Sequence, residues 1–91
     1  MKLKIYSVFD KQLSVYGNVI SSPNDITLRR DLEVSAKHLK DIARHPDFFS
    51  LHCVGEFDQS TGVIEPIVPR VVCEMSIFYG EDNDEVSGDN K

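Results

Sequence analysis

Hydrophobic and polar residues alternate near the start of the chain, and this two-residue period predicts strands. Residues 2–9 (KLKIYSVF) form the first such run. After a short polar link, residues 13–20 (LSVYGNVI) form a second run, so an antiparallel hairpin is the simplest interpretation. Gly17 inside the second run suggests a β-bulge or a close approach of another backbone segment.

The middle of the chain changes to a helical period. Ser22 can cap the free amides of a helix start, and Pro23 fits the first helical position. From there to Arg44, apolar residues recur at spacings of three and four. Ser35 could cap a second helix, so the sequence leaves open one long helix or two short ones. Pro46 ends the helical segment in either case.

A second hairpin is predicted by residues 49–57 and 63–68, because the polar link between them begins with Asp and ends with Gly. Pro66 and Pro69 confine this second segment to an edge of the sheet or to its end. Residues 70–79 are rich in β-branched and aromatic side chains, which favours a further strand. The elements together predict an α+β fold, in which two antiparallel β-hairpins form a small sheet with one long or two short helices packed on it.

Chain length and charge define the expected organisation. A chain of 91 residues allows one domain, which we expect over residues 1–80. Residues 81–91 hold five of the 15 acids and one base without hydrophobic periodicity, and predict a disordered acidic tail. Ten acids and nine bases remain in residues 1–80, so the expected folded body is nearly neutral although the whole chain carries −5.

Small size also limits stability, since such a chain buries only about two thirds of its unfolded surface. Dimerisation through a strand edge or through the helix is therefore expected. Cys53 and Cys73 lie in apolar, strand-like runs and are interpreted as buried, reduced thiols, with a disulfide as the alternative.

No apolar run approaches the length of about 20 residues that a membrane span needs. The first residues, MKLKIY, are too charged to resemble a signal peptide. We expect a cytoplasmic protein with no membrane partner.

Catalytic motifs are missing from the sequence, which contains no Gly-rich phosphate loop, no serine nucleophile motif and no metal-ligand spacing. His38, His45 and His52 recur every seven residues, but one precedes a proline and another lies in a predicted strand. These histidines therefore cannot share a helical face. Glu56 and Asp58 are better explained as part of the hairpin turn than as a catalytic pair. We expect a protein that is not an enzyme and that uses no cofactor and no metal.

Nucleic-acid binding has a better physical case. Five cations follow the predicted helical segment: Arg29, Arg30, Lys37, Lys40 and Arg44. If the helix is continuous, the last four project within an arc of about 80°, with Arg29 at its edge. Such a line of cations would match the spacing of DNA phosphates and release counterions on binding. Glu33 and Asp41 share the face, so an ordinary solvated helix face is the alternative.

Aromatic side chains could complete a site for single-stranded DNA, because bases stack on aromatic rings. Tyr6 and Tyr16 lie on the two strands of the first hairpin. The strand period places Tyr6 opposite Leu3 and Ile5, on an expected outer surface. Packing in the core is the alternative for both tyrosines.

Several segments in the same order resemble a known family. They are Tyr6–Asp10, Ser22–Asp25 followed by Leu28-Arg29, His45–Phe48, Leu51, Gly55–Asp58 and Thr61-Gly62. In these segments, spread over residues 4–66, the chain resembles the small non-structural protein of gokushovirus-type microviruses, in the Microviridae.

The resemblance implies a non-enzymatic bacteriophage protein in the cytoplasm of the infected bacterium. Its implied role is to assist synthesis of viral single-stranded DNA or the switch to packaging. The five helical cations would then hold the DNA backbone, and Tyr6 and Tyr16 would stack on bases. The alternative is an interaction module that binds a viral or host replication protein without contacting DNA, using apolar residues such as Ile26 and Val34.

Overall fold

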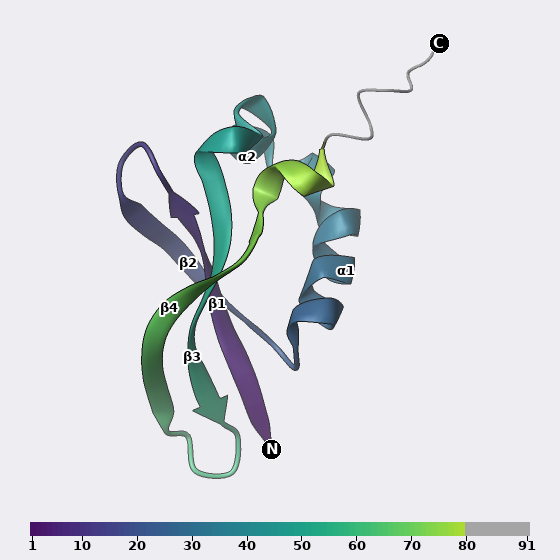
Figure 1. Ribbon diagram of the computed structural model, residues 1–91. Coiled ribbons are helices and arrows are strands. Elements are labelled where there is room, and N and C mark those ends of the chain that lie inside the picture. Colours follow the sequence, from purple (N-terminus) through teal and green to yellow (C-terminus); the bar gives the residue numbers. More distant parts are fainter. Residues whose placement is uncertain (80–91) are drawn as a thin grey trace.

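The computed structural model describes residues 1–79, which form a four-stranded antiparallel sheet with a helical layer on one side (Figure 1). The strands are β1 (Lys2–Asp10), β2 (Val15–Ser22), β3 (Phe49–Asp58) and β4 (Ile64–Glu74). The helical elements are α1 (Asp25–Ser35), η1 (Ala36–His38), α2 (Lys40–Arg44), η2 (Pro46–Phe48) and η3 (Met75–Phe78). The predicted α+β fold is confirmed, and the predicted acidic tail at 81–91 lies outside the described residues.

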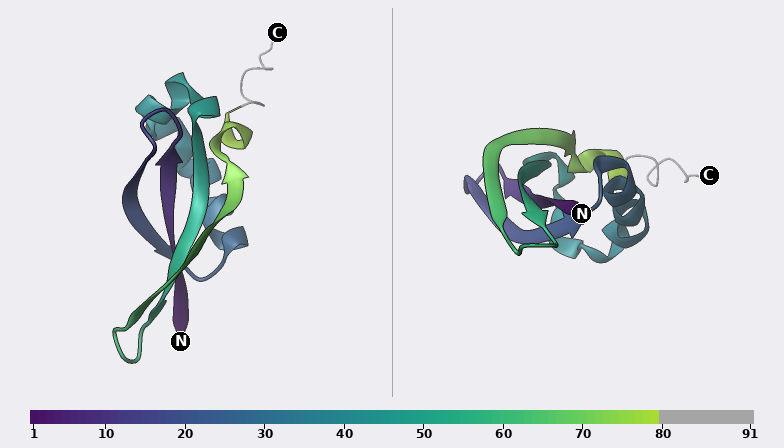
Figure 2. Two further views of the ribbon diagram at one scale, coloured as in Figure 1. Left: turned by 60° about the vertical axis from the view of Figure 1, so that its left-hand side comes forward. Right: turned by 90° about the horizontal axis from the view of Figure 1, so that it is seen from below.

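Both predicted hairpins are present, and they join through their first strands in the order β2-β1-β3-β4. β4 therefore lies at an edge, as Pro66 and Pro69 predicted. The β1–β2 register shifts between Ser7 and Phe9, so the bulge expected at Gly17 is also confirmed. The sheet is strongly twisted, and β4 curves around the other strands (Figure 2).

The helix start differs from the prediction by two residues. Asn24, in extended backbone, is the N-cap, and its side-chain oxygen accepts a hydrogen bond from the Thr27 amide at 2.8 Å. Ser22 instead directs its hydroxyl toward the Asn24 carbonyl at 3.4 Å. Ser22 belongs to the end of β2, so capping falls to the next polar side chain along the chain.

The helical segment is two helices rather than one. Leu39 leaves the helical conformation with φ −93° and ψ 76°, between η1 and α2. Ser35 does not cap the second helix, because its hydroxyl donates to the Asp31 carbonyl at 3.1 Å within α1. The break turns the chain so that Leu39 and Ile42 both pack against the core. The continuous helix on which the 80° arc of cations depended is therefore wrong.

The last part of the chain also departs from the expected strand. β4 ends at Glu74, and residues 75–78 form the 3₁₀ helix η3. This turn buries Met75 completely and brings the Tyr79 hydroxyl to the Ala36 carbonyl, to which it donates at 2.9 Å. The burial of Met75 and Tyr79 against the helical layer outweighs the preference of residues 75–79 for a strand.

The core lies between the helical layer and the sheet face that this layer covers. Its buried members are Tyr6, Leu28, Leu32, Leu51, Cys53 and Met75. Both cysteines are free thiols, and the predicted burial holds for Cys53, whereas Cys73 is half-buried. The core is small, and it fills only one side of the sheet.

The backbones of β3 and β4 approach each other closely at Gly55. A Cβ at Gly55 would lie 2.8 Å from the Glu65 carbonyl oxygen, whereas one at Gly17 would meet nothing nearer than 3.7 Å. We expect Gly55→Ala to lower the free energy of unfolding by about 1–3 kcal/mol, because the backbone must shift. Gly17→Ala, the matched control, should leave stability unchanged or slightly raised. Urea unfolding measures both, and equal stabilities would contradict the close approach.

Candidate nucleic-acid interface

The five helical cations are all exposed. None of them makes an ion pair within residues 1–79, where the paired cations are Lys2, Lys11 and Arg70. The break at Leu39 distributes them over three elements, with Arg29 and Arg30 in α1, Lys37 in η1, and Lys40 and Arg44 in α2. They are available for an anionic partner, but they do not form the single line that the sequence predicted.

The two tyrosines have different environments. Tyr16 is 42% exposed, in agreement with the predicted outer position, whereas Tyr6 is fully buried and its predicted outer position is wrong. The helical layer covers the sheet face that carries Tyr6, and Leu3 and Ile5 lie on the other face. A strand period cannot reveal which face a helix will cover. Tyr6 therefore cannot stack on a base.

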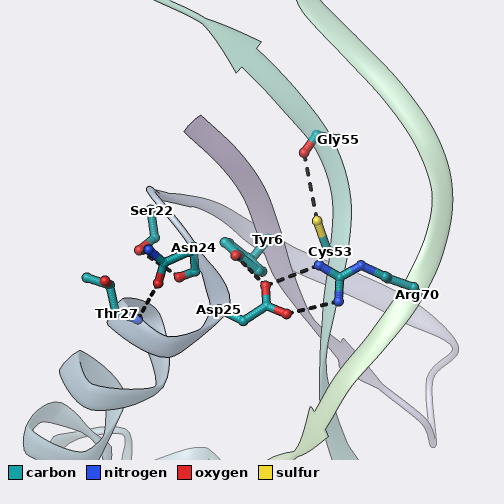
Figure 3. A network of polar contacts seen from close by, with 8 residues as sticks. All are labelled: Tyr6, Ser22, Asn24, Asp25, Thr27, Cys53, Gly55 and Arg70. Atoms are coloured by element: carbon teal, nitrogen blue, oxygen red, sulfur yellow. Dashed lines mark hydrogen bonds and ion pairs between the residues drawn. The ribbon is translucent and has the colours of Figure 1, made fainter. Parts of the chain in front are cut away.

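Tyr6 instead belongs to a polar network that fixes α1 to the sheet (Figure 3). Its hydroxyl donates a hydrogen bond of 2.6 Å to Oδ1 of Asp25, the first residue of α1. Arg70 of β4 donates from Nη1 to Asp25 Oδ2 at 3.0 Å and from Nη2 to Asp25 Oδ1 at 3.2 Å. The Asp25 carboxylate thus links the start of α1 to β4 through a bidentate ion pair with Arg70, and to β1 through the hydrogen bond from Tyr6.

The charges in this network shift the acidity of its members. The hydrogen bonds from Arg70 hold the pKa of Asp25 below its usual value, and the hydrogen bond from Tyr6 acts in the same direction. Burial raises the pKa of Tyr6 far above its usual range, and the neighbouring Asp25 raises it further. The phenol is therefore neutral and the carboxylate charged at physiological pH, and the network serves as an anchor.

This anchor holds the helical segment over an open groove beside the β1–β2 hairpin. The groove has a volume of about 690 Å³, within the range of ligand sites in proteins. Most of its lining is apolar, including Val8 and Ile20 from the hairpin and Phe49 from β3. Lys40 and Asp41 line the side formed by α2.

Two of the residues selected from the sequence, Tyr16 and Lys40, border the groove. The ring of Tyr16 points to the opposite sheet face, where it packs on Phe9, so only Lys40 offers its side chain to the groove. The other selected residues are not part of its lining. Phe49, Leu39 and Ile42, which the sequence analysis assigned to strand or helix without a role, contribute to it. Of these, only Phe49 could have been selected from the sequence as a candidate binding residue, because it is aromatic. A groove between elements that are distant in sequence leaves no local sequence signal.

A second cluster lies on the opposite sheet face, where Phe9, Tyr16 and His52 pack together. The ring centroid of Phe9 lies 4.7 Å from that of Tyr16 and 5.2 Å from that of His52, on which the Phe9 ring stacks. His52 Nδ1 lies 2.9 Å from the Tyr16 hydroxyl, and its Nε2 lies 2.8 Å from Ser50 Oγ. Burial lowers the pKa of His52, which favours the neutral ring. Ser50 is 3% exposed, so this contact presents no accessible nucleophile.

The histidines of the seven-residue spacing are dispersed, as the sequence indicated. His38 lines the groove, His45 stacks on Phe48, and His52 belongs to the cluster with Tyr16. Within residues 1–79, no three metal-ligating side chains gather in one place. In the same part of the chain, no helix has the length and apolar character to cross a membrane.

Replacing Asp25 with asparagine keeps the side-chain size and removes the charge that Arg70 contacts. We expect Asp25→Asn to lower the free energy of unfolding by about 1 kcal/mol near pH 7, a modest loss because the ion pair is partly exposed. The folded pKa of Asp25 lies below the unfolded value of about 3.9, so this contribution is present above about pH 4 and is lost as the pH falls through the folded pKa.

Urea unfolding between about pH 7 and about pH 2 measures this effect. The difference between wild type and Asp25→Asn should shrink as the pH falls. Asp31→Asn, an exposed aspartate of the same helix, is the control and should stay within about 0.5 kcal/mol of wild type. A difference between wild type and Asp25→Asn that is independent of pH would exclude the carboxylate as the anchor.

The family described as Phage ORF5 protein matches residues 3–78, which include every described strand and helix except the first residue of β1. No curated protein and no solved structure matches the chain. Because the match covers most of the chain, including the groove and the anchoring network, the chain belongs to the Phage ORF5 protein family.

Proposed function

We propose that this phage protein is a non-enzymatic accessory protein that binds single-stranded DNA in the cytoplasm of the infected bacterium. Its role would be to assist viral single-stranded DNA synthesis or the switch to packaging, in a phage of the gokushovirus type within the Microviridae. Membership of the phage family supports the viral setting. The observation that carries the proposal is a groove with an apolar interior and an exposed lysine at its wall.

The groove suits an unpaired base better than a base pair. A base is planar and largely apolar on its faces, and Val8, Ile20 and Phe49 offer an apolar surface of matching character. Bases in a duplex are stacked and paired inside the helix, so they cannot enter without paying for unstacking. A preference for single strands follows from this difference.

Lys40 would then hold the phosphate next to the bound base. Lys37 and Arg44 are exposed on the adjoining elements η1 and α2 and would contact neighbouring phosphates. Three phosphate contacts on a single strand give an expected slope of about −2 for log K against log salt. The body of residues 1–79 has ten acids and nine bases, so local contacts rather than overall charge must provide the attraction.

The test is the affinity for a labelled single-stranded oligonucleotide and for the matching duplex, measured by fluorescence anisotropy at increasing salt. We expect tighter binding to the single strand, and Lys40→Glu should weaken it about tenfold or more, because a phosphate contact becomes a repulsion. Lys2→Glu changes the net charge equally at the other end of the sheet and is the control (Figure 1). Absence of binding at low salt, or equal effects of the two variants, would reject the proposal.

A protein–protein interaction module that binds a viral or host replication protein is the second candidate. Ile26 is 75% exposed and Val34 is 70% exposed, both on α1. Large apolar side chains on a helix that already buries Leu28 and Leu32 would suit an apolar partner surface. Binding through them would persist at high salt, unlike binding to phosphates.

A further inference from the structure

The sheet face opposite the helical layer, here called the open face, carries an apolar patch. Strand alternation and the register place residues from all four strands on it. We define the open-face patch as Leu3, Ile5, Val19, Phe57, Ile64 and Val71. Val19, Ile64 and Val71 are 70%, 63% and 58% exposed, so they are apolar side chains in contact with solvent.

The charges of the sheet avoid this face. Lys4, Glu56 and Glu65 lie next to one another across β1, β3 and β4, on the same side of the sheet as the helices. Arg70 lies in register with Tyr6, on the same face. Lys2, Asp10 and Asp58 follow the same alternation. β2 has no charged residue, and Glu74, which does lie on the open face, is paired with Lys11 at 2.6 Å.

This distribution of charged and apolar side chains is the opposite of that expected for a solvent-exposed sheet face. An antiparallel sheet with helices on one side normally presents polar side chains on the other. Here the separation is clearest where the strands extend beyond the helices, because neither face is covered there (Figures 1 and 2). In that half of the sheet, Lys2 lies 3.9 Å from both Glu56 and Glu65 on one side, and Leu3, Phe57 and Ile64 occupy the other.

We propose that the open-face patch is the interface between two copies of this chain, packed sheet against sheet. The near-absence of charge excludes phosphates as the occupant and allows a patch to face its own copy without repulsion. The near balance of ten acids and nine bases over residues 1–79 limits repulsion between the two folded bodies, because most of the net charge of −5 belongs to residues 80–91. Pro66 and Pro69 deprive the β4 edge of amide donors, so this edge is poorly suited to pair with another strand.

In such a dimer, the two sheets would lie about 10 Å apart with the helices on the outside. Apolar side chains of both copies would supply the second half of the core that each chain lacks. Both grooves would remain on the outer surface, so the dimer does not depend on the proposed DNA binding and does not obstruct it.

The test is sedimentation equilibrium of the purified chain from about 1 µM to about 200 µM. We expect a dimer, and Ile64→Lys should raise its dissociation constant about tenfold or more, because a two-fold interface contains each substitution twice. Val71→Lys, on the same patch, should act in the same direction. Val34→Lys introduces the same charge at an equally exposed apolar site on α1, outside the patch, and should leave dimerisation unchanged.

Circular dichroism should show that each variant keeps the wild-type secondary structure. A wild-type chain that stays monomeric over this range would overturn the proposal. A dimer that neither Ile64→Lys nor Val71→Lys weakens would also overturn it and would place the contact at the β2 edge or on the helices. Equal weakening by Val34→Lys would do the same.

Discussion

The Asp25 carboxylate is the point on which the arrangement of helices and sheet depends. It receives hydrogen bonds from Tyr6 of β1 and Arg70 of β4, and it opens α1 immediately after the Asn24 cap. The charged oxygens thereby fix the start of the helical layer to strands on both sides of β3. The groove exists because the far end of the same layer turns at Leu39 and passes beside the β1–β2 hairpin.

The single helical layer gives the sheet two faces of different character. One face buries Tyr6, Leu51 and Cys53 and completes a small core. The other retains apolar side chains that no described element of the chain covers. This asymmetry places the groove on the side of the helices and the proposed contact between copies on the opposite side.

The sequence predicted the features that depend on local chemistry. Turn residues and alternation defined both hairpins, and prolines placed β4 at an edge, because each effect acts within a few residues. The side of the sheet that Tyr6 faces could not be predicted, because alternation is unchanged when the covered face is exchanged. The position of the helix break at Leu39 could not be predicted either. The break allows Leu39 and Ile42 to pack against the core, and no helix-breaking residue lies at this position in the sequence.

The candidate site was predictable only in part for the same reason. Lys40 was selected for its charge and lines the groove, whereas Tyr16 borders the groove but directs its ring to the opposite face of the sheet. The position of Lys40 beside the β1–β2 hairpin follows from the turn before α2, which no local sequence signal indicates. The contact of His52 with Tyr16 depends on three strands at once, so no short segment could indicate it.

The position of Arg70 in the chain has a consequence for biosynthesis. Arg70 lies 45 residues after Asp25, in the last of the described strands, yet it secures the first turn of α1. A ribosome therefore releases the β1–β2 hairpin and α1, which the Tyr6–Asp25 hydrogen bond joins, well before Arg70 is available to complete the network. Such long-range closure is slow compared with local pairing, so the domain acquires its final form as a unit only after β4 has been made.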